Sequence, residues 1–169
     1  MAIKNLQEKF MHELGDIYDA ENRFLKGQQE MLANATDPQL QQMLQQHATE
    51  TQQQIANLDQ VFSILGAKPK AVPCEAAKGL VKEAQEVMQE AKAETLRDCF
   101  IGGAATKVEH YEIASYRGLI TGAEQMGQQQ VVKLLQQNLG QEEKTAKMLE
   151  QSAPKLLQTA MQAEQQLAQ

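Results

Sequence analysis

The sequence predicts an all-α protein that folds as a four-helix bundle, and three observations support this prediction. First, the 169 residues are 42% hydrophobic but only 4% aromatic, with no Trp; Ala, Leu, Met, Gln, Glu and Lys are abundant, and these residues favour helix. Second, apolar residues recur every three or four positions, as on one face of an amphipathic helix. Third, two pairs of glutamates lie at matching distances from two predicted turns, as expected for two antiparallel hairpins. We expect one domain over residues 1–169.

The first hairpin is predicted from two amphipathic stretches around residues 34–37. The first helix extends from about Lys4 to Ala33, because its apolar positions advance by three or four. Thr36 or Asp37 is the expected cap of the second helix, with Pro38 at its first position. This helix continues to about Leu65.

A long connection follows the first hairpin. Gly66, Pro69 and Pro73 end the second helix. A shorter helix from Glu75 to about Ala91 is predicted next. Together these segments form a crossover that can return the chain along the bundle.

The second hairpin is predicted on either side of Gly127. Its helices extend from about Thr95 to Met126 and from about Gln128 to Leu149. Pro154 is expected to separate the last long helix from a short helix over about 155–168. We expect the first and third long helices to be parallel, with both tight turns at the same end of the bundle.

Charge and composition exclude several classes of function. The formal charge is −6 and the pI is near 5.1, whereas a sequence-independent nucleic-acid binder needs a basic surface. No signal peptide or membrane span is expected, since charged residues interrupt the N-terminal segment and no apolar run is long enough. These features predict a cytoplasmic protein that does not bind nucleic acid or membranes.

The glutamate pairs predict a site inside the bundle. Glu21 and Glu50 are equidistant from the turn at residues 34–37, and Glu109 and Glu142 are equidistant from a point beside Gly127. At about 1.5 Å of rise per residue, both pairs lie roughly 22–25 Å from their turns. The four carboxylates are therefore expected to meet at one level.

Buried carboxylates require protons, cations or a metal to offset their repulsion. His47 lies one turn from Glu50, and Glu112 lies one turn from Glu109, so both are candidate further ligands. Carboxylates with an imidazole suit two iron ions, with manganese as the alternative. The competing interpretation is that each Glu reaches solvent at the edge of the core and that His47 is a hydrogen-bonded core histidine.

A family resemblance supports the metal interpretation. The segment from Lys107 to Tyr116, with Glu109 and Glu112 inside it, resembles the signature of the YciF-like stress-response proteins, a branch of the ferritin-like superfamily. Residues 14–21, 47–51 and 55–62 resemble that family in the same order, so the similarity covers roughly residues 3–150.

The resemblance implies a ferritin-like bundle, commonly a homodimer, with a di-iron centre and a role in bacterial stress responses. It places the candidate metal ligands on Glu21, Glu50, Glu109, Glu112 and Glu142, with His47 nearby, and assigns no catalytic residue. Gln53 and Thr145 occupy positions where the broader superfamily has histidines three residues after Glu50 and Glu142. With the di-iron centre intact, the expected function is Fe(II) oxidation or handling of peroxide or O₂. The alternative is a non-catalytic structural or interaction protein with a vestigial metal site.

Overall fold

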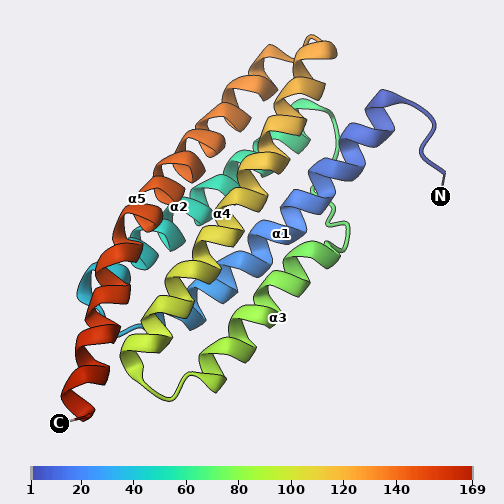
Figure 1. The fold of residues 1–169 in the computed structure, drawn as a ribbon. Coiled ribbons are helices and arrows are strands. Elements are labelled where there is room, and N and C mark those ends of the chain that lie inside the picture. The colour runs from blue at the N-terminus through green and yellow to red at the C-terminus, as the bar shows by residue number, and fades with distance from the viewer. Residues whose placement is uncertain (1, 169) are drawn as a thin grey trace.

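The computed structural model describes residues 2–168, and these residues form five helices and no strand. The long helices are α1 (Leu6–Asn34), α2 (Pro38–Ile64), α4 (Glu94–Gln125) and α5 (Gln129–Leu167). They lie side by side, and the shorter α3 (Glu75–Glu90) packs against α1 and α4 (Figure 1). The all-α prediction is confirmed.

Local sequence determines where the helices of each hairpin begin and end. The Asp37 side chain accepts the N–H of Leu40 at 2.9 Å, and Pro38 is the first residue of α2. Gly66 and Gly127 follow α2 and α4 with φ of +70° and +69°, a conformation that glycine adopts without steric cost. The predicted cap of α2 and the predicted turn at Gly127 are thus confirmed.

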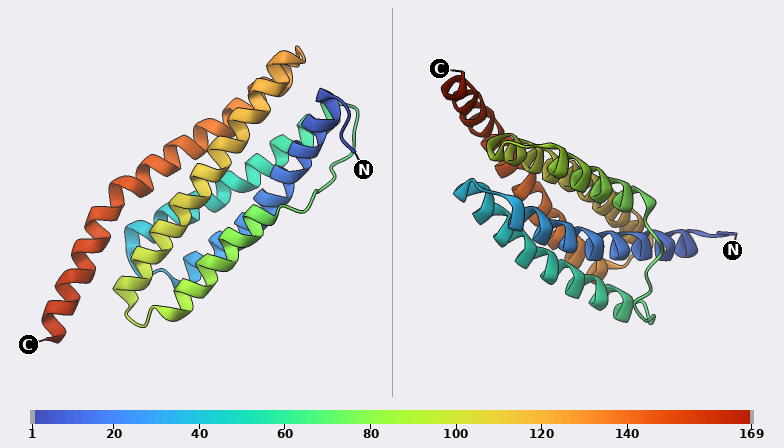
Figure 2. Two further views of the ribbon diagram at one scale, coloured as in Figure 1. Left: turned by 45° about the vertical axis from the view of Figure 1, so that its right-hand side comes forward. Right: turned by 90° about the horizontal axis from the view of Figure 1, so that it is seen from below.

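The expectation that the first and third long helices are parallel is wrong, because α1 and α4 are antiparallel (Figures 1 and 2). Phe10 near the start of α1 packs against Gly122 near the end of α4. At the other end, the backbone N–H of Thr36 donates to Asp98 Oδ1 at 2.8 Å. Because α3 returns the chain along the bundle, α4 starts beside the α1–α2 turn. The two tight turns therefore lie at opposite ends.

The expectation that Pro154 separates two helices is also wrong. Pro154 lies inside α5, which is continuous from residue 129 to 167 and bends in its second half (Figure 2). Proline removes one backbone donor and kinks a helix without necessarily ending it. The Ser152 hydroxyl donates to the Leu149 carbonyl at 2.8 Å, and Leu156 and Ala160 remain buried beyond the proline. This packing explains why the helix continues.

The connection between α2 and α3 lies directly on α1. The Val72 N–H donates to the Gly15 carbonyl at 2.9 Å. A Cβ at position 15 would come within 2.7 Å of the Lys70 carbonyl oxygen and of Val72 Cγ2. The close approach of the connection therefore requires glycine at this position.

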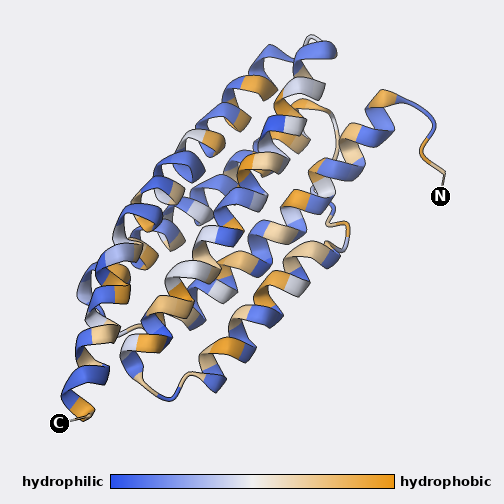
Figure 3. Cartoon of the chain, viewed as in Figure 1, coloured by the Kyte–Doolittle hydropathy of each residue, from blue (hydrophilic) through white to orange (hydrophobic). Residues whose placement is uncertain are grey.

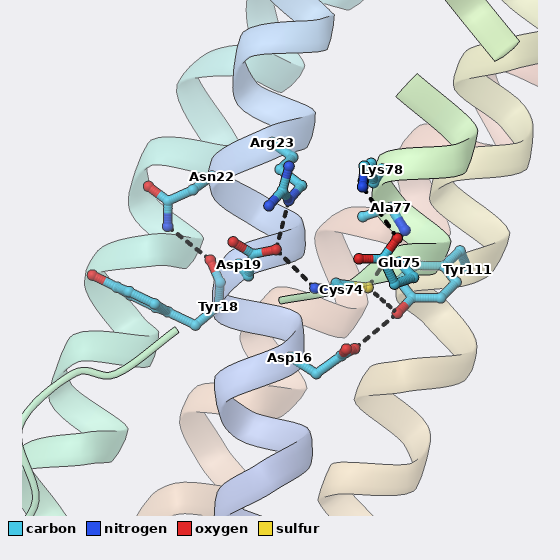
Figure 4. A network of polar contacts seen from close by, with 10 residues as sticks. All are labelled: Asp16, Tyr18, Asp19, Asn22, Arg23, Cys74, Glu75, Ala77, Lys78 and Tyr111. Atoms are coloured by element: carbon cyan, nitrogen blue, oxygen red, sulfur yellow. Dashed lines mark hydrogen bonds and ion pairs between the residues drawn. The ribbon is translucent and has the colours of Figure 1, made fainter. Parts of the chain in front are cut away.

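A polar network fixes the start of α3 against α1 and α4 (Figure 4). The Cys74 N–H donates to Asp19 Oδ2 at 2.9 Å, and Asp19 also pairs with Arg23. Tyr111 donates its hydroxyl proton to Asp16, so the Cys74 thiol donates to the Tyr111 oxygen, 2.9 Å away. Both cysteines are free thiols.

The core consists of two apolar clusters at the two ends of the bundle. Each long helix carries hydrophobic and hydrophilic residues in alternation along its length (Figure 3), as expected for helices with one buried face. Buried polar residues occupy the middle of the bundle between the clusters; among them are Glu21, His47, Thr51, Gln54, Glu109, Glu112 and Glu142. Across residues 2–168, no helix has the combined length and apolarity needed to span a bilayer.

Candidate metal centre

Four side chains from three helices converge in the buried polar layer. His47 comes from α2, Glu109 and Glu112 come from α4, and Glu142 comes from α5. Each offers one ligand atom, and these atoms all lie within 4.8 Å of one another. The four residues are at most 2% exposed. They form the candidate metal centre of the protein.

Helical spacing brings these side chains together. Glu109 and Glu112 are three residues apart and therefore share one face of α4. Glu142 lies seven residues from both Leu135 and Leu149, which are buried on the same stripe of α5. His47 follows Leu44 by three residues on the buried face of α2. The apolar neighbours thus fix which way the polar donors point.

The donor atoms face one another, and His47 lies within ion-pair distance of two of the carboxylates. Nε2 of His47 lies 2.9 Å from Glu109 Oε1 and 3.7 Å from Glu142 Oε2. Within the described part of the chain, both ring nitrogens of His47 and both carboxylate oxygens of Glu109, Glu112 and Glu142 lack hydrogen-bond partners. Buried polar atoms are rarely left in this state. Three carboxylates and one imidazole are also a donor set that suits iron or manganese.

Glu21 lies next to the four-residue group and is fully buried. Its Oε1 accepts a hydrogen bond from the Tyr116 hydroxyl, while its Oε2 has no partner among residues 2–168. Asn138 donates to the Tyr116 oxygen at 3.0 Å and accepts from Asn57 at 2.7 Å. Since Tyr116 already accepts from Asn138, its single proton is directed at Glu21. One oxygen of Glu21 therefore remains available to a metal.

Burial raises the pKa values of these carboxyl groups. Burial, with the charge of Glu142, raises the pKa of Glu21 to about 8. Burial also raises the pKa of Glu109 to about 8, and the charges of Glu21 and Glu50 contribute. The pKa values of Glu112 and Glu142 are raised well above the ordinary range, chiefly by burial. The metal-free centre therefore holds protons at neutral pH, and a bound cation must displace them.

Glu50 is the predicted ligand that the structure does not bring into the group. Its side chain is 17% exposed, and its Oε1 lies 3.5 Å from Lys144 Nζ. It also accepts a hydrogen bond from Gln46 at 2.9 Å. Its charge nevertheless contributes to the raised pKa of Glu109, so Glu50 lies at the outer edge of the centre.

The two positions where the superfamily has histidines supply no nitrogen. The Gln53 side chain donates to Asn57 at 3.0 Å, and Thr145 is a buried hydroxyl residue. His47 supplies the imidazole from the opposite side of Glu50 along α2. The sequence reasoning missed the roles of Tyr116 and Asn138, although Tyr116 lies four residues after Glu112 and Asn138 four residues before Glu142.

Comparison with known proteins agrees with the resemblance inferred from the sequence. The family described as "Domain of unknown function (DUF892)" matches residues 5–162. The chain belongs to this family. It is 38% identical over 146 residues to protein YciF of Escherichia coli strain K12, covering 86% of this chain and 88% of YciF.

Solved structures show the same fold. The crystal structure of the E. coli stress protein YciF matches with a TM-score of 0.88 and 36% identity, over 92% of this chain and 99% of that one. YcfI from Rhodopseudomonas palustris, for which a structural role has been suggested, matches with a TM-score of 0.86 and 42% identity, over 88% and 94%. A protein from Xanthomonas campestris matches with a TM-score of 0.77 and 25% identity, over 95% and 99%.

Proposed function

We propose that this member of the YciF family is a ferritin-like four-helix bundle whose buried centre binds two iron ions, with manganese as the alternative metal. The observation that carries the proposal is the set of inward-facing donor atoms on His47, Glu109, Glu112 and Glu142 that lack hydrogen-bond partners among the described residues. A cation would replace the missing partners and screen the repulsion between carboxylates.

The residues divide into those that hold metal and those that orient them. The four grouped donors would bind the first ion. Glu21, through its free Oε2, would extend the carboxylate set toward a second ion and is oriented by Tyr116. When bound, iron would supply one-electron redox chemistry, which fits Fe(II) oxidation or the handling of peroxide or O₂ in a stress response.

The residues of the centre determine which protons leave when a cation binds and which stay. The carboxyl protons held in the metal-free state leave when a cation binds, because only carboxylates are ligands. The apolar clusters on either side limit access of water and strengthen electrostatic interactions in the layer. Tyr116 keeps its proton, because burial raises its pKa well above the ordinary value.

A non-catalytic structural role is the second candidate. It is favoured by the absence of histidines at positions 53 and 145 and by raised carboxyl pKa values that let the layer persist protonated. The suggested structural role of YcfI points the same way. In this case the centre would bind no metal under physiological conditions.

Metal analysis separates the two functions. Protein purified without chelator is loaded anaerobically with Fe(II) or Mn(II), passed through a desalting column and analysed for metal per chain. About two ions per chain support the proposal, whereas one ion supports a metal centre but contradicts the two-ion count. Wild-type protein that retains no metal supports the structural role. A Glu109→Gln/Glu142→Gln variant should lose retention, and Glu143→Gln, on the exposed side of α5, should keep it.

We also propose that the protein is a homodimer, as the family resemblance implies. Large apolar side chains are exposed on the adjoining ends of α4 and α5: Phe100 is 45%, Leu157 57% and Met161 60% exposed. These ends lie together because Leu156 packs on Gly102. Sedimentation equilibrium should give twice the chain mass, and a Phe100→Ser/Leu157→Ser variant should sediment as a monomer. A wild-type monomer would contradict this proposal.

A further inference from the structure

A cation that reaches the buried centre must enter from the surface. Glu50 connects the surface of the bundle with the buried donors. Its carboxylate contacts Lys144 and Gln46 on the outside, yet its charge is felt by Glu109 on the inside. His47 precedes it by one helical turn. Glu50 therefore lies between solvent and the four grouped donors.

A groove leads along the same seam between α2 and α5. It has a volume of about 220 Å³ and is lined by Gln42, Met43, Gln46, Met148, Gln151 and Ser152, among others. Gln46 both lines this groove and donates to Glu50. Met148 lies one turn beyond Lys144 on α5. The groove is thus lined with amide, hydroxyl and thioether groups, and the Glu50–Lys144 pair lies one helical turn beyond its Gln46 and Met148.

The cavity that reaches the centre from the side of α1, α3 and α4 is much smaller than this groove. A cavity between α1, α3 and α4 reaches Glu109, but its volume is only about 10 Å³ and Phe24, Met31, Val81 and Val108 line much of it. This space is about the size of one water. Gln28 and Glu109 are the polar residues of its lining, so a hydrated cation would have to lose nearly all its water there with few polar groups to replace it.

We infer that the seam between α2 and α5 is the cation entrance of the metal centre, in which Glu50 transfers the cation inward and Lys144 holds Glu50 outward until a cation arrives. This inference rests on the proposed function. The step is an exchange of ionic partners: Glu50 leaves Lys144, binds the cation in the groove and passes it to Glu109 and His47. No covalent bond forms or breaks, and Glu50 does not remain among the resident ligands.

The charges along the seam suit such an exchange. The Lys144 side chain is 55% exposed, and its Nζ pairs with Glu50 at 3.5 Å. An exposed ion pair of this kind contributes little stability in water and is therefore easily broken. Lys155 lies at the far end of the groove, where its Nζ contacts Gln39 at 3.2 Å. Glu50 is thus the carboxylate at the inner end, between a competing cation and the buried donors.

Rates of cobalt uptake test the inference. Co(II) is mixed anaerobically with metal-free protein in a stopped-flow instrument, and its visible absorption reports transfer from water to imidazole and carboxylate ligands. Lys144→Gln should load about two- to fivefold faster than wild type, the fold-change equivalent of an exposed ion pair. Lys147→Gln is the matched control, because Lys147 is exposed on the same helix. It should load at the wild-type rate.

Glu50→Gln provides the opposite perturbation. Uptake should slow on the order of tenfold, because the charge that attracts the cation is lost, while the final Co(II) content and spectrum stay unchanged. If Lys144→Gln loads no faster than Lys147→Gln, or if Glu50→Gln changes the final content or spectrum rather than the rate, the inference is wrong although the centre binds metal. If the wild type takes up no Co(II), the proposed function falls as well.

Discussion

Raising the pH should destabilise the metal-free protein, because folding holds protons that the unfolded chain releases. The pKa of Glu109 rises from 4.5 to about 8 on folding. Between these values native Glu109 holds a proton that the unfolded chain releases, so its contribution to stability falls as pH rises and levels off above about 8. At 1.36 kcal/mol per pKa unit, the roughly three units between pH 5 and pH 8 correspond to a loss on the order of 4 kcal/mol for one such carboxyl.

Glu109→Gln isolates this contribution, because the amide resembles the protonated acid and cannot ionise. Urea unfolding with chelator present should show a small effect at pH 5 and a gain of several kcal/mol over wild type at pH 8. Glu124→Gln, an exposed change on the same helix, should follow the wild type at both pH values. A Glu109→Gln variant with the same loss between pH 5 and 8 as wild type would refute the reasoning.

Three further outcomes are expected. Glu142→Ala should weaken anaerobic Mn(II) binding, measured by calorimetry, by at least about tenfold. Glu143→Ala should not weaken it, because Glu143 pairs with Arg117 at the surface. Equal effects would show that the wrong face of α5 has been assigned to the metal centre. Mn(II) at a hundredfold excess over its dissociation constant should raise the stability of wild type by about 2.7 kcal/mol, and melting that is insensitive to metal would contradict a folded-state site. Gly15→Ala should cost about 1–3 kcal/mol, since its Cβ meets the α2–α3 connection. Gly103→Ala, which meets nothing within 4 Å, should leave stability unchanged or increase it, and a similar loss for both in urea unfolding would contradict the contact at Gly15.

The helices were predictable because the signals that define them are local. Apolar spacing placed each helix, and Asp37, Pro38, Gly66 and Gly127 determined the ends within one or two residues. The direction of α4 was not predictable in this way, since it depends on how far α3 carries the chain along the bundle. The continuity of α5 through Pro154 depends on packing by Leu156 and Ala160. This packing cannot be inferred from the helix propensity of proline.

The centre was predictable in outline because it lies near the middle of the bundle. A carboxylate about half a helix length from its turn reaches the same level whichever end the turn occupies, so the height argument placed Glu109 and Glu142 together despite the wrong helix direction. Glu50 differs because helix rotation and the Lys144 ion pair, rather than height, decide its orientation. The hydrogen bond from Tyr116 to Glu21 joins two helices and has no counterpart in local sequence.

Anomalous diffraction from crystals soaked in Mn(II) tests the central claim most directly. The account predicts a manganese peak between His47 Nε2 and the carboxylates of Glu109, Glu112 and Glu142, with a second peak on the side of Glu21. No peak among these four residues at saturating Mn(II), in crystals where they keep their present arrangement, would contradict the metal centre.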